Sequence, residues 1–196
     1  MLWWHKQTAD AHVQDRIGHL DLFAVKYYVF GCVTHARDVL SKAQTRTPGS
    51  KFEGIAQMID KFWLHYPSSL QAPLRDLLIT EAATFLPGEG SESAWEDAMI
   101  WAAAYAFAVV KRDQFSTDAA QEAHEALHQA YWSVFSYNHD KIEAYSSDDD
   151  IQKVEKSSPA CKAEIDFQLS FLKTMETMRG QPPVYSTLLQ LMDNGN

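Results

Sequence analysis

Five consecutive residues in the second half of the chain carry the residue types and the spacing for metal chemistry: His124, Glu125, Ala126, Leu127 and His128. They match the H-E-x-x-H pattern of zinc hydrolases, in which two imidazoles one helical turn apart bind the metal and the glutamate activates a water molecule. In such an enzyme His124 and His128 would be the zinc ligands and Glu125 the general base. Catalytic zinc also takes a third protein ligand, so the pair needs a partner from elsewhere in the chain.

The residues after His128 do not supply that third ligand. They read QAYWSVF and lack the glycine and histidine that continue the motif in metzincin proteases. His139 lies 11 residues further along the same helix face. At 1.5 Å per residue this is about 16 Å, too far to share a metal with His128. Glu155 and Glu164, from a later helix, are the candidates that would have to return to the pair.

A different metal arrangement needs one distant histidine beside two histidines spaced by four residues. This is the four-helix metal site of the DinB type, for which His35 or His65 would be the distant ligand. Three N-terminal histidines are also spaced by seven residues, near one line of a continuous helix: His5, His12 and His19. Gly18 argues against an unbroken helix there, and a surface stripe of histidines needs no metal.

Apolar residues recur at helical spacing through almost the whole chain, and no run alternates with period two for long enough to predict a sheet. We therefore expect an all-α fold, a single compact bundle of about six to eight helices over residues 1–196. The expected helices cover residues 3–16, 21–41, 50–63, 70–85, 94–112, 116–145, 158–175 and 186–192. Three serines are expected to cap helices, namely Ser50, Ser116 and Ser158.

The expected helix of residues 116–145 has a face of small and apolar side chains that indicates burial. Relative to Leu127 on that face, His124 and His128 lie at about 60° and 100°, and Glu125 lies near 160°, toward solvent. Histidines at such a margin are usually packing residues, so the pattern favours packing over zinc binding. Closest approach to a neighbouring helix is expected at a strip of alanines, Ala98, Ala102 and Ala106.

Composition and charge limit the classes of function. The chain has 196 residues, 46% of them hydrophobic, and a formal net charge of −9. This charge disfavours general binding to nucleic acid and favours a basic protein partner. Cys32 and Cys161 form no C-x-x-C pair, the N-terminus lacks a signal-peptide pattern, and the apolar run of residues 98–110 is too short to span a membrane. We expect a cytoplasmic protein without a membrane segment.

The second half of the chain resembles a known family. An acidic residue opens an alanine-rich helix, and a polar turn, a second alanine-spaced helix, an acidic linker and a last helix with the pattern E-x-D-x-Q follow. The residues that carry this pattern are Asp97, Ala98 and Ala102 in the first helix and Glu164, Asp166 and Gln168 in the last. This arrangement resembles the YjaG-type family of helical proteins of unknown function. The resemblance implies an all-helical single domain and brings no established catalytic residue.

The function expected from these features is non-enzymatic and needs no cofactor. A small cytosolic immunity or antitoxin-like protein would neutralise a toxin domain by occlusion, through an acidic surface that attracts a basic partner. Its expected contacts are loop carboxylates and an N-terminal aromatic pair: Glu89, Glu92, Asp148, Asp149, Asp150, Trp3 and Trp4. Trp3 and Trp4 cannot both face inward on one helix. The alternatives are a zinc-dependent hydrolase or DinB-like enzyme that uses His124, Glu125 and His128, and a homodimeric helical scaffold.

Overall fold

The structure of the protein is a computed structural model that describes residues 3–43, 50–85, 94–139 and 147–178. Within these ranges the regular structure is helical, and no strand occurs. The helices are α1 (Trp3–Asp10), α2 (Val13–Gly18), α3 (Leu22–Ala43), α4 (Lys51–Leu64), the 3-10 helix η1 (Ser68–Leu70), α5 (Ala72–Ala83), α6 (Ala94–Lys111), α7 (Thr117–Asn138), α8 (Asp148–Ser157) and α9 (Pro159–Thr177). The predicted all-α class is confirmed.

The three predicted N-caps are confirmed. The hydroxyl of Ser50 accepts a hydrogen bond from the backbone N–H of Glu53, at the start of α4. Ser116 and Ser158 do the same at α7 and α9, with acceptor distances of 3.2 Å and 3.4 Å. Each serine satisfies one of the backbone donors that a helix start leaves unpaired, so these boundaries follow from local chemistry.

Two predicted boundaries are wrong, and one lies outside the described residues. The helix expected over residues 3–16 is divided into α1 and α2 because His12 adopts the left-handed conformation, with φ at 52°. Asp148, Asp149 and Asp150, expected as a solvated linker or a helix start, form the first turn of a helix, α8, which Ser147 caps and which continues to Ser157. The helix expected to reach residue 145 ends at Asn138. The short helix expected over residues 186–192 lies outside the described part of the chain.

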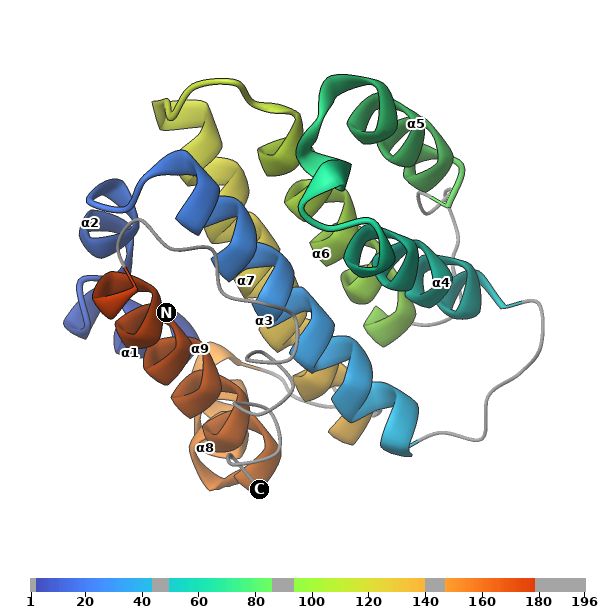
Figure 1. The fold of residues 1–196 in the computed structure, drawn as a ribbon. Helices are drawn as coiled ribbons and strands as arrows, with labels where there is room; N and C mark the ends of the chain where they lie inside the picture. The colour runs from blue at the N-terminus through green and yellow to red at the C-terminus, as the bar shows by residue number, and fades with distance from the viewer. Residues whose placement is uncertain (1–2, 44–49, 86–93, 140–146, 179–196) are drawn as a thin grey trace.

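The helices α3, α6 and α7 form the centre of the bundle. Figure 1 shows α3 crossing in front of α7, with α4, α5 and α6 on one side and α1, α2 and α9 on the other. The contact between α6 and α7 is the most extensive in the molecule. Ala98, Ala102 and Ala106 of α6 are all buried, and side chains limited to a methyl group let two helix backbones approach closely.

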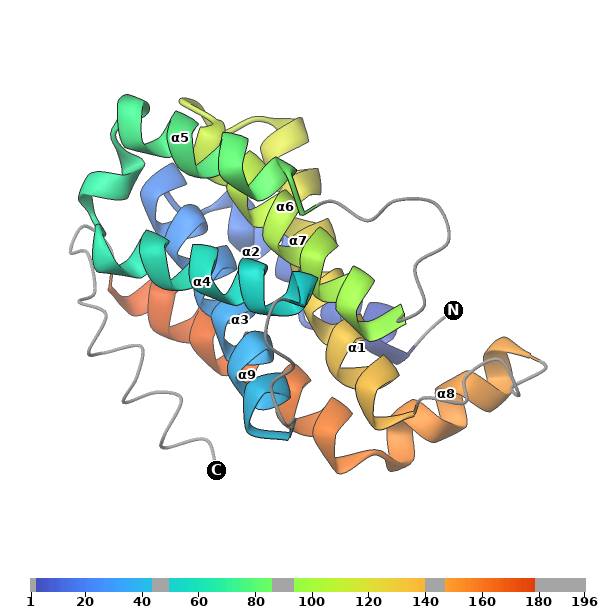
Figure 2. The ribbon, with the colours of Figure 1, turned by 90° about the vertical axis from the view of Figure 1, so that its right-hand side faces the viewer.

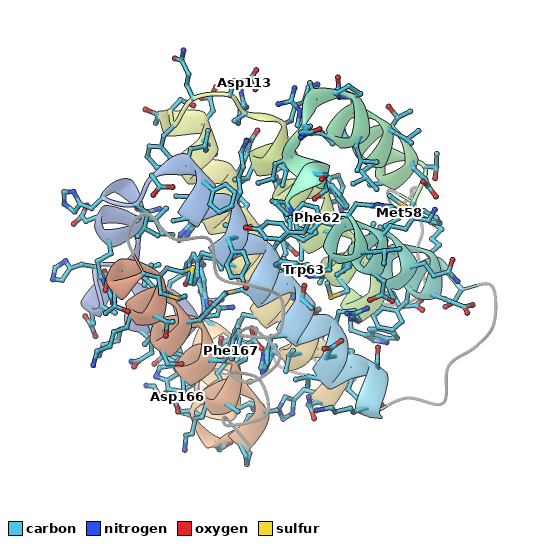
Figure 3. The ribbon with its side chains drawn as sticks, in the orientation of Figure 1. Met58, Phe62, Trp63, Asp113, Asp166 and Phe167 are labelled. Atoms are coloured by element: carbon cyan, nitrogen blue, oxygen red, sulfur yellow. The ribbon has the colours of Figure 1, made fainter. Side chains whose placement is uncertain are left out.

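One hydrophobic cluster connects the helices. It draws buried side chains from α1 to α7 and from α9, and α8 packs Ile151 and Val154 against it. Between α3 and α4, the rings of Phe30 and Phe62 stack at 3.7 Å, and the indole N–H of Trp63 donates to the hydroxyl of Thr34. Figure 3 shows Phe62 and Trp63 at this contact. None of the described helices has the length and hydropathy needed to cross a lipid bilayer.

Candidate functional site

The two histidines of the H-E-x-x-H pattern meet the indole ring of Trp4. His124 and His128 are half-buried on α7, and the centroid of the Trp4 ring lies 5.1 Å and 5.0 Å from theirs. Trp4 itself has no exposed surface. Its ring also stacks on Tyr131, one further helical turn along α7, at 6.1 Å. The N-terminal helix α1 is therefore docked on α7 by one tryptophan inserted along the line of these side chains.

A third imidazole joins this contact. The ring of His5, next to Trp4 on α1, lies 4.7 Å from that of His128 and 6.1 Å from that of His124. We call Trp4, His5, His124 and His128 the imidazole–indole cluster. From the sequence, His5 was expected only as part of a surface stripe of histidines. No local pattern shows that residues more than a hundred positions apart are in contact.

The third ligands expected from the sequence are engaged elsewhere. His35 binds the carboxylate of Glu164, and His65 is exposed at the end of α4. Glu155 accepts hydrogen bonds from the backbone N–H of Trp3 and the hydroxyl of Tyr131. In the described structure none of these four candidates lies with the α7 pair in a group of three possible metal ligands.

The α7 histidines lie in an environment that favours the neutral imidazole. Burial, together with the smaller influence of the neighbouring rings of His5 and His124, lowers the pKa of His128 to about 4. Burial is also the main cause of the lowered pKa of His124. Among the described residues, Nδ1 of His124 and Nε2 of His128 are buried without a hydrogen-bond partner. Both rings are therefore uncharged at neutral pH, which suits packing against an indole.

The arrangement does not fit a zinc site in this conformation. Zinc draws nitrogen ligands to about 2.0–2.1 Å around one point. No group of three His, Cys, Asp or Glu side chains in the described ranges is placed to hold a metal ion. The indole of Trp4 lies against both α7 imidazoles, and Glu125 is half-buried beside them on α7. The three imidazoles are close together, but their spacing is set by packing around Trp4.

A cavity of about 500 Å³ opens beside the cluster, where α1 and α2 meet α7. Its polar lining comes from both N-terminal helices and from α7, namely His5, Thr8, His12, Gln14, Asp15 and His124. The left-handed turn at His12 redirects the chain between α1 and α2, and His12 and Asp15 lie 3.9 Å apart in it. This cavity gives His5 and His124 access to small molecules.

The predicted acidic contacts begin helix α8. Asp148 and Asp149 are exposed and Asp150 is half-buried in the first turn, where negative side chains complement the helix dipole. Figure 2 shows α8 extending away from the other helices. Glu89 and Glu92, the other predicted carboxylate contacts, lie outside the described residues.

The two N-terminal tryptophans are adjacent in the sequence and point in different directions, so they differ in burial. Trp4 is a core residue, which removes it from any surface contact. Trp3 is half-buried, and its backbone N–H donates to Oε2 of Glu155 at 2.7 Å, which joins α1 to α8. From Glu155 to Asp148 is seven residues, about 10 Å along the helix. We call Trp3, Asp148, Asp149 and Asp150 the α1–α8 surface.

The sequence analysis did not predict a chain of buried polar groups on α9. Gln168 accepts from Nε1 of Trp4 at 3.1 Å and donates to Oε1 of Glu164 at 3.0 Å, and Oε2 of Glu164 lies 2.8 Å from Nδ1 of His35. Glu164 and Gln168 are 1% and 2% exposed. A usable signal existed, because both fall on the apolar stripe of α9 with Cys161 and Phe171. Polar residues at apolar positions indicate a buried network.

Comparisons with known proteins leave the site to be interpreted from its own geometry. A scan against protein-family models, a search of curated proteins and a search of solved structures each find no match for this chain.

Proposed function

We propose that this protein is a cytosolic binding protein, of the immunity or antitoxin kind, that neutralises a basic toxin domain by occlusion. The observation that carries the proposal is the α1–α8 surface, which places a partly exposed tryptophan on the helix next to three consecutive aspartates. Trp3 and the three aspartates are far apart in the sequence, and only the fold brings their helices together. Kinship with the YjaG-type family stays a prediction beside this proposal.

The two kinds of side chain on this surface have separate roles in binding. Exposed carboxylates raise the rate of encounter with a basic partner, by roughly tenfold or more at low salt. A tryptophan buried on association supplies much of the affinity, because large aromatic side chains dominate interface energetics. The chain's net charge of −9 adds a long-range attraction to the same basic partner. The active surface of the toxin would then be covered without any chemical step.

Co-expression with toxins encoded beside its own gene tests the proposal. We expect the wild-type chain to restore growth and to copurify with one toxin. The variant Asp148→Asn/Asp149→Asn/Asp150→Asn should associate roughly tenfold more slowly at low salt and rescue poorly. Asp118→Asn is the matched control, because Asp118 is an exposed carboxylate in the first turn of α7. The proposal fails if no adjacent toxin is neutralised, or if both variants behave alike.

A second candidate function is a metal-dependent enzyme of the DinB or zinc-hydrolase type. The proximity of His5 to His124 and His128 supports it, because this is the distant histidine that such a site needs. The rings would have to turn around Trp4 to bind a metal together. Metal analysis of protein purified without chelator or metal-affinity resin tests this, beside His5→Ala and His128→Ala. About one equivalent of zinc that both variants lose would favour it, and metal-free, normally folded protein would oppose it.

The homodimeric scaffold also stays a prediction. Leu64 and Leu77 are exposed by 77% and 60%, on α4 and α5. Sedimentation of a monomer at micromolar concentration would remove this third candidate.

A further inference from the structure

A second histidine site lies on the side of the bundle where α3 meets α9. The imidazole of His35 stacks flat on the ring of Phe167, with centroids 3.7 Å apart and planes 5° apart. The carboxylate of Glu164 is hydrogen-bonded to Nδ1 of His35. Figure 3 shows Phe167 between α9 and α3, and Asp166 at the outer side of α9. The ring of His35 is therefore fixed in plane and in rotation.

The hydrogen bonds around Glu164 assign the proton between the two side chains. The indole N–H of Trp4 can only donate, so the oxygen of the Gln168 amide must face it. The amide nitrogen then donates to Oε1 of Glu164 and to the carbonyl of Leu127. A carboxylate buried this deeply and already receiving one N–H is best satisfied by a second, from Nδ1 of His35. When the ring carries a single proton and that proton lies on Nδ1, Nε2 is the proton acceptor.

His35 lines a groove of about 610 Å³, together with Glu164 and Phe167. Among the described residues no group binds Nε2, and the His35 side chain keeps 15% of its surface exposed. The lining of the groove includes the apolar side chains of Val39, Val134 and Ala163 and the polar side chains of Lys162, Asp166 and His35. Glu164 and Asp166 outweigh Lys162 in charge, so an uncharged ligand enters the groove more readily than a free anion. Its volume suits a small organic molecule.

We propose that His35 is the proton-accepting residue of a ligand site in the groove between α3 and α9, for small uncharged apolar molecules that carry one acidic hydroxyl group, such as phenols. The hydroxyl hydrogen-bonds to Nε2, and the apolar part of the ligand packs on Val39 and Val134. When the proton moves, the O–H bond breaks and an N–H bond forms. The resulting imidazolium lies between the phenolate and Glu164, which stabilises it. This site is separate from the α1–α8 surface and does not depend on the function proposed above.

The first test uses the wild-type protein and needs no variant. ¹⁵N spectra of the imidazoles at neutral pH report which nitrogen of His35 carries the proton, and we expect Nδ1. Titration with 4-nitrophenol should then move the resonances of His35, Val39 and Val134 and increase the phenolate absorption band. A proton on Nε2, or resonances unmoved by millimolar 4-nitrophenol, would overturn the proposal.

Variants separate this role from a purely structural ion pair. His35→Gln and Glu164→Gln should each weaken 4-nitrophenol binding by about tenfold or more, because each removes the base or the charge that orients it. His65→Gln, an exposed histidine on α4, is the matched control and should bind like the wild type. Thermal melts of each variant show whether the fold is retained. Folded variants that bind 4-nitrophenol as tightly as the wild type would overturn the proposal.

Discussion

The imidazole–indole cluster and the His35–Glu164 pair place the same side chain in two different environments. His124 and His128 meet an indole and further imidazoles, and the nitrogens Nδ1 and Nε2 respectively are buried without a partner in the described part of the chain. His35 instead lies flat on Phe167, with a buried carboxylate on one nitrogen and a groove at the other.

The difference shows that burial and a hydrogen-bonded carboxylate affect different properties of a histidine. Burial favours the neutral ring and is the main cause of the lowered pKa values of His124 and His128, and at His124 it outweighs the opposite influence of Glu125. A carboxylate on Nδ1 instead fixes which nitrogen is available for chemistry. The two histidines of the sequence motif thus lie against the ring of Trp4, whereas a histidine outside any motif lies against a carboxylate and a groove.

Replacing Trp4 disrupts both regions and should have the largest effect. Its ring fills the space between the α7 histidines, and its Nε1 orients Gln168, which binds Glu164. Trp4→Ala should lower the free energy of unfolding by about 4 kcal/mol, measured with urea. Trp101→Ala, at a tryptophan 39% exposed on α6, is the matched control and should cost much less. Equal losses in the two variants would show that Trp4 does not connect the regions.

Removing Glu164 tests the paired region alone. Glu164→Ala leaves Nδ1 of His35 without its acceptor and removes one of the two acceptors of the Gln168 amide, and losing these hydrogen bonds to a buried charged group should cost about 3 kcal/mol. His128→Ala should cost clearly less, because Nε2 of His128 has no hydrogen bond to lose. Urea unfolding of both variants at pH 7 measures the difference. The reverse order would contradict the comparison.

Acidification should weaken the cluster selectively. The pKa of His128 is about 4 in the folded protein and near 6.5 in the unfolded chain, so the unfolded chain binds the proton first as the pH falls. Stability is therefore lost below pH 6.5 and continues to fall toward pH 4. From pH 7 to pH 5 the loss from His128 is about 2 kcal/mol. The urea midpoint should therefore depend less steeply on pH in His128→Gln than in the wild type. An equally steep pH dependence in this variant would show that His128 is not the source of the lost stability.

Substitution of His5 should give the smallest effect. The neighbouring His5 ring contributes to the lowered pKa of His128, after burial itself. In His5→Gln the pKa of His128 should rise slightly while the fold is retained, as read from the pH dependence of its imidazole resonances. A fall in that pKa would mean that His5 is not a repulsive neighbour of His128.

The sequence predicted the features of the fold that local chemistry determines. Helical periodicity predicted the all-α class, and the hydroxyls of Ser50, Ser116 and Ser158 marked three helix starts, because capping involves residues only three apart. The break at His12 was missed because a non-glycine residue in the left-handed region costs energy and has no strong local signal. The three aspartates left a linker and a helix start both open, because aspartate has low helix propensity but favours a helix start, and the structure shows the helix start.

The candidate sites depend on contacts that spacing does not encode. Trp4 bonds to Gln168 across 164 positions, and His35 to Glu164 across 129. The helical wheel placed His124 and His128 correctly at the margin of the buried face, but it could not show that Trp4 and His5 would cover them. The polar residues on the apolar stripe of α9 were the readable signal for the second site.

One measurement tests the contrast between the two histidine environments most directly, namely an NMR titration of all imidazoles of the wild-type protein from pH 8 to pH 4.5. We expect His128 to remain neutral at pH 5, His124 to titrate below the ordinary histidine value, and His35 to carry its neutral-state proton on Nδ1. An α7 pair that titrates at or above pH 6.5, or a proton on Nε2 of His35, would contradict the account.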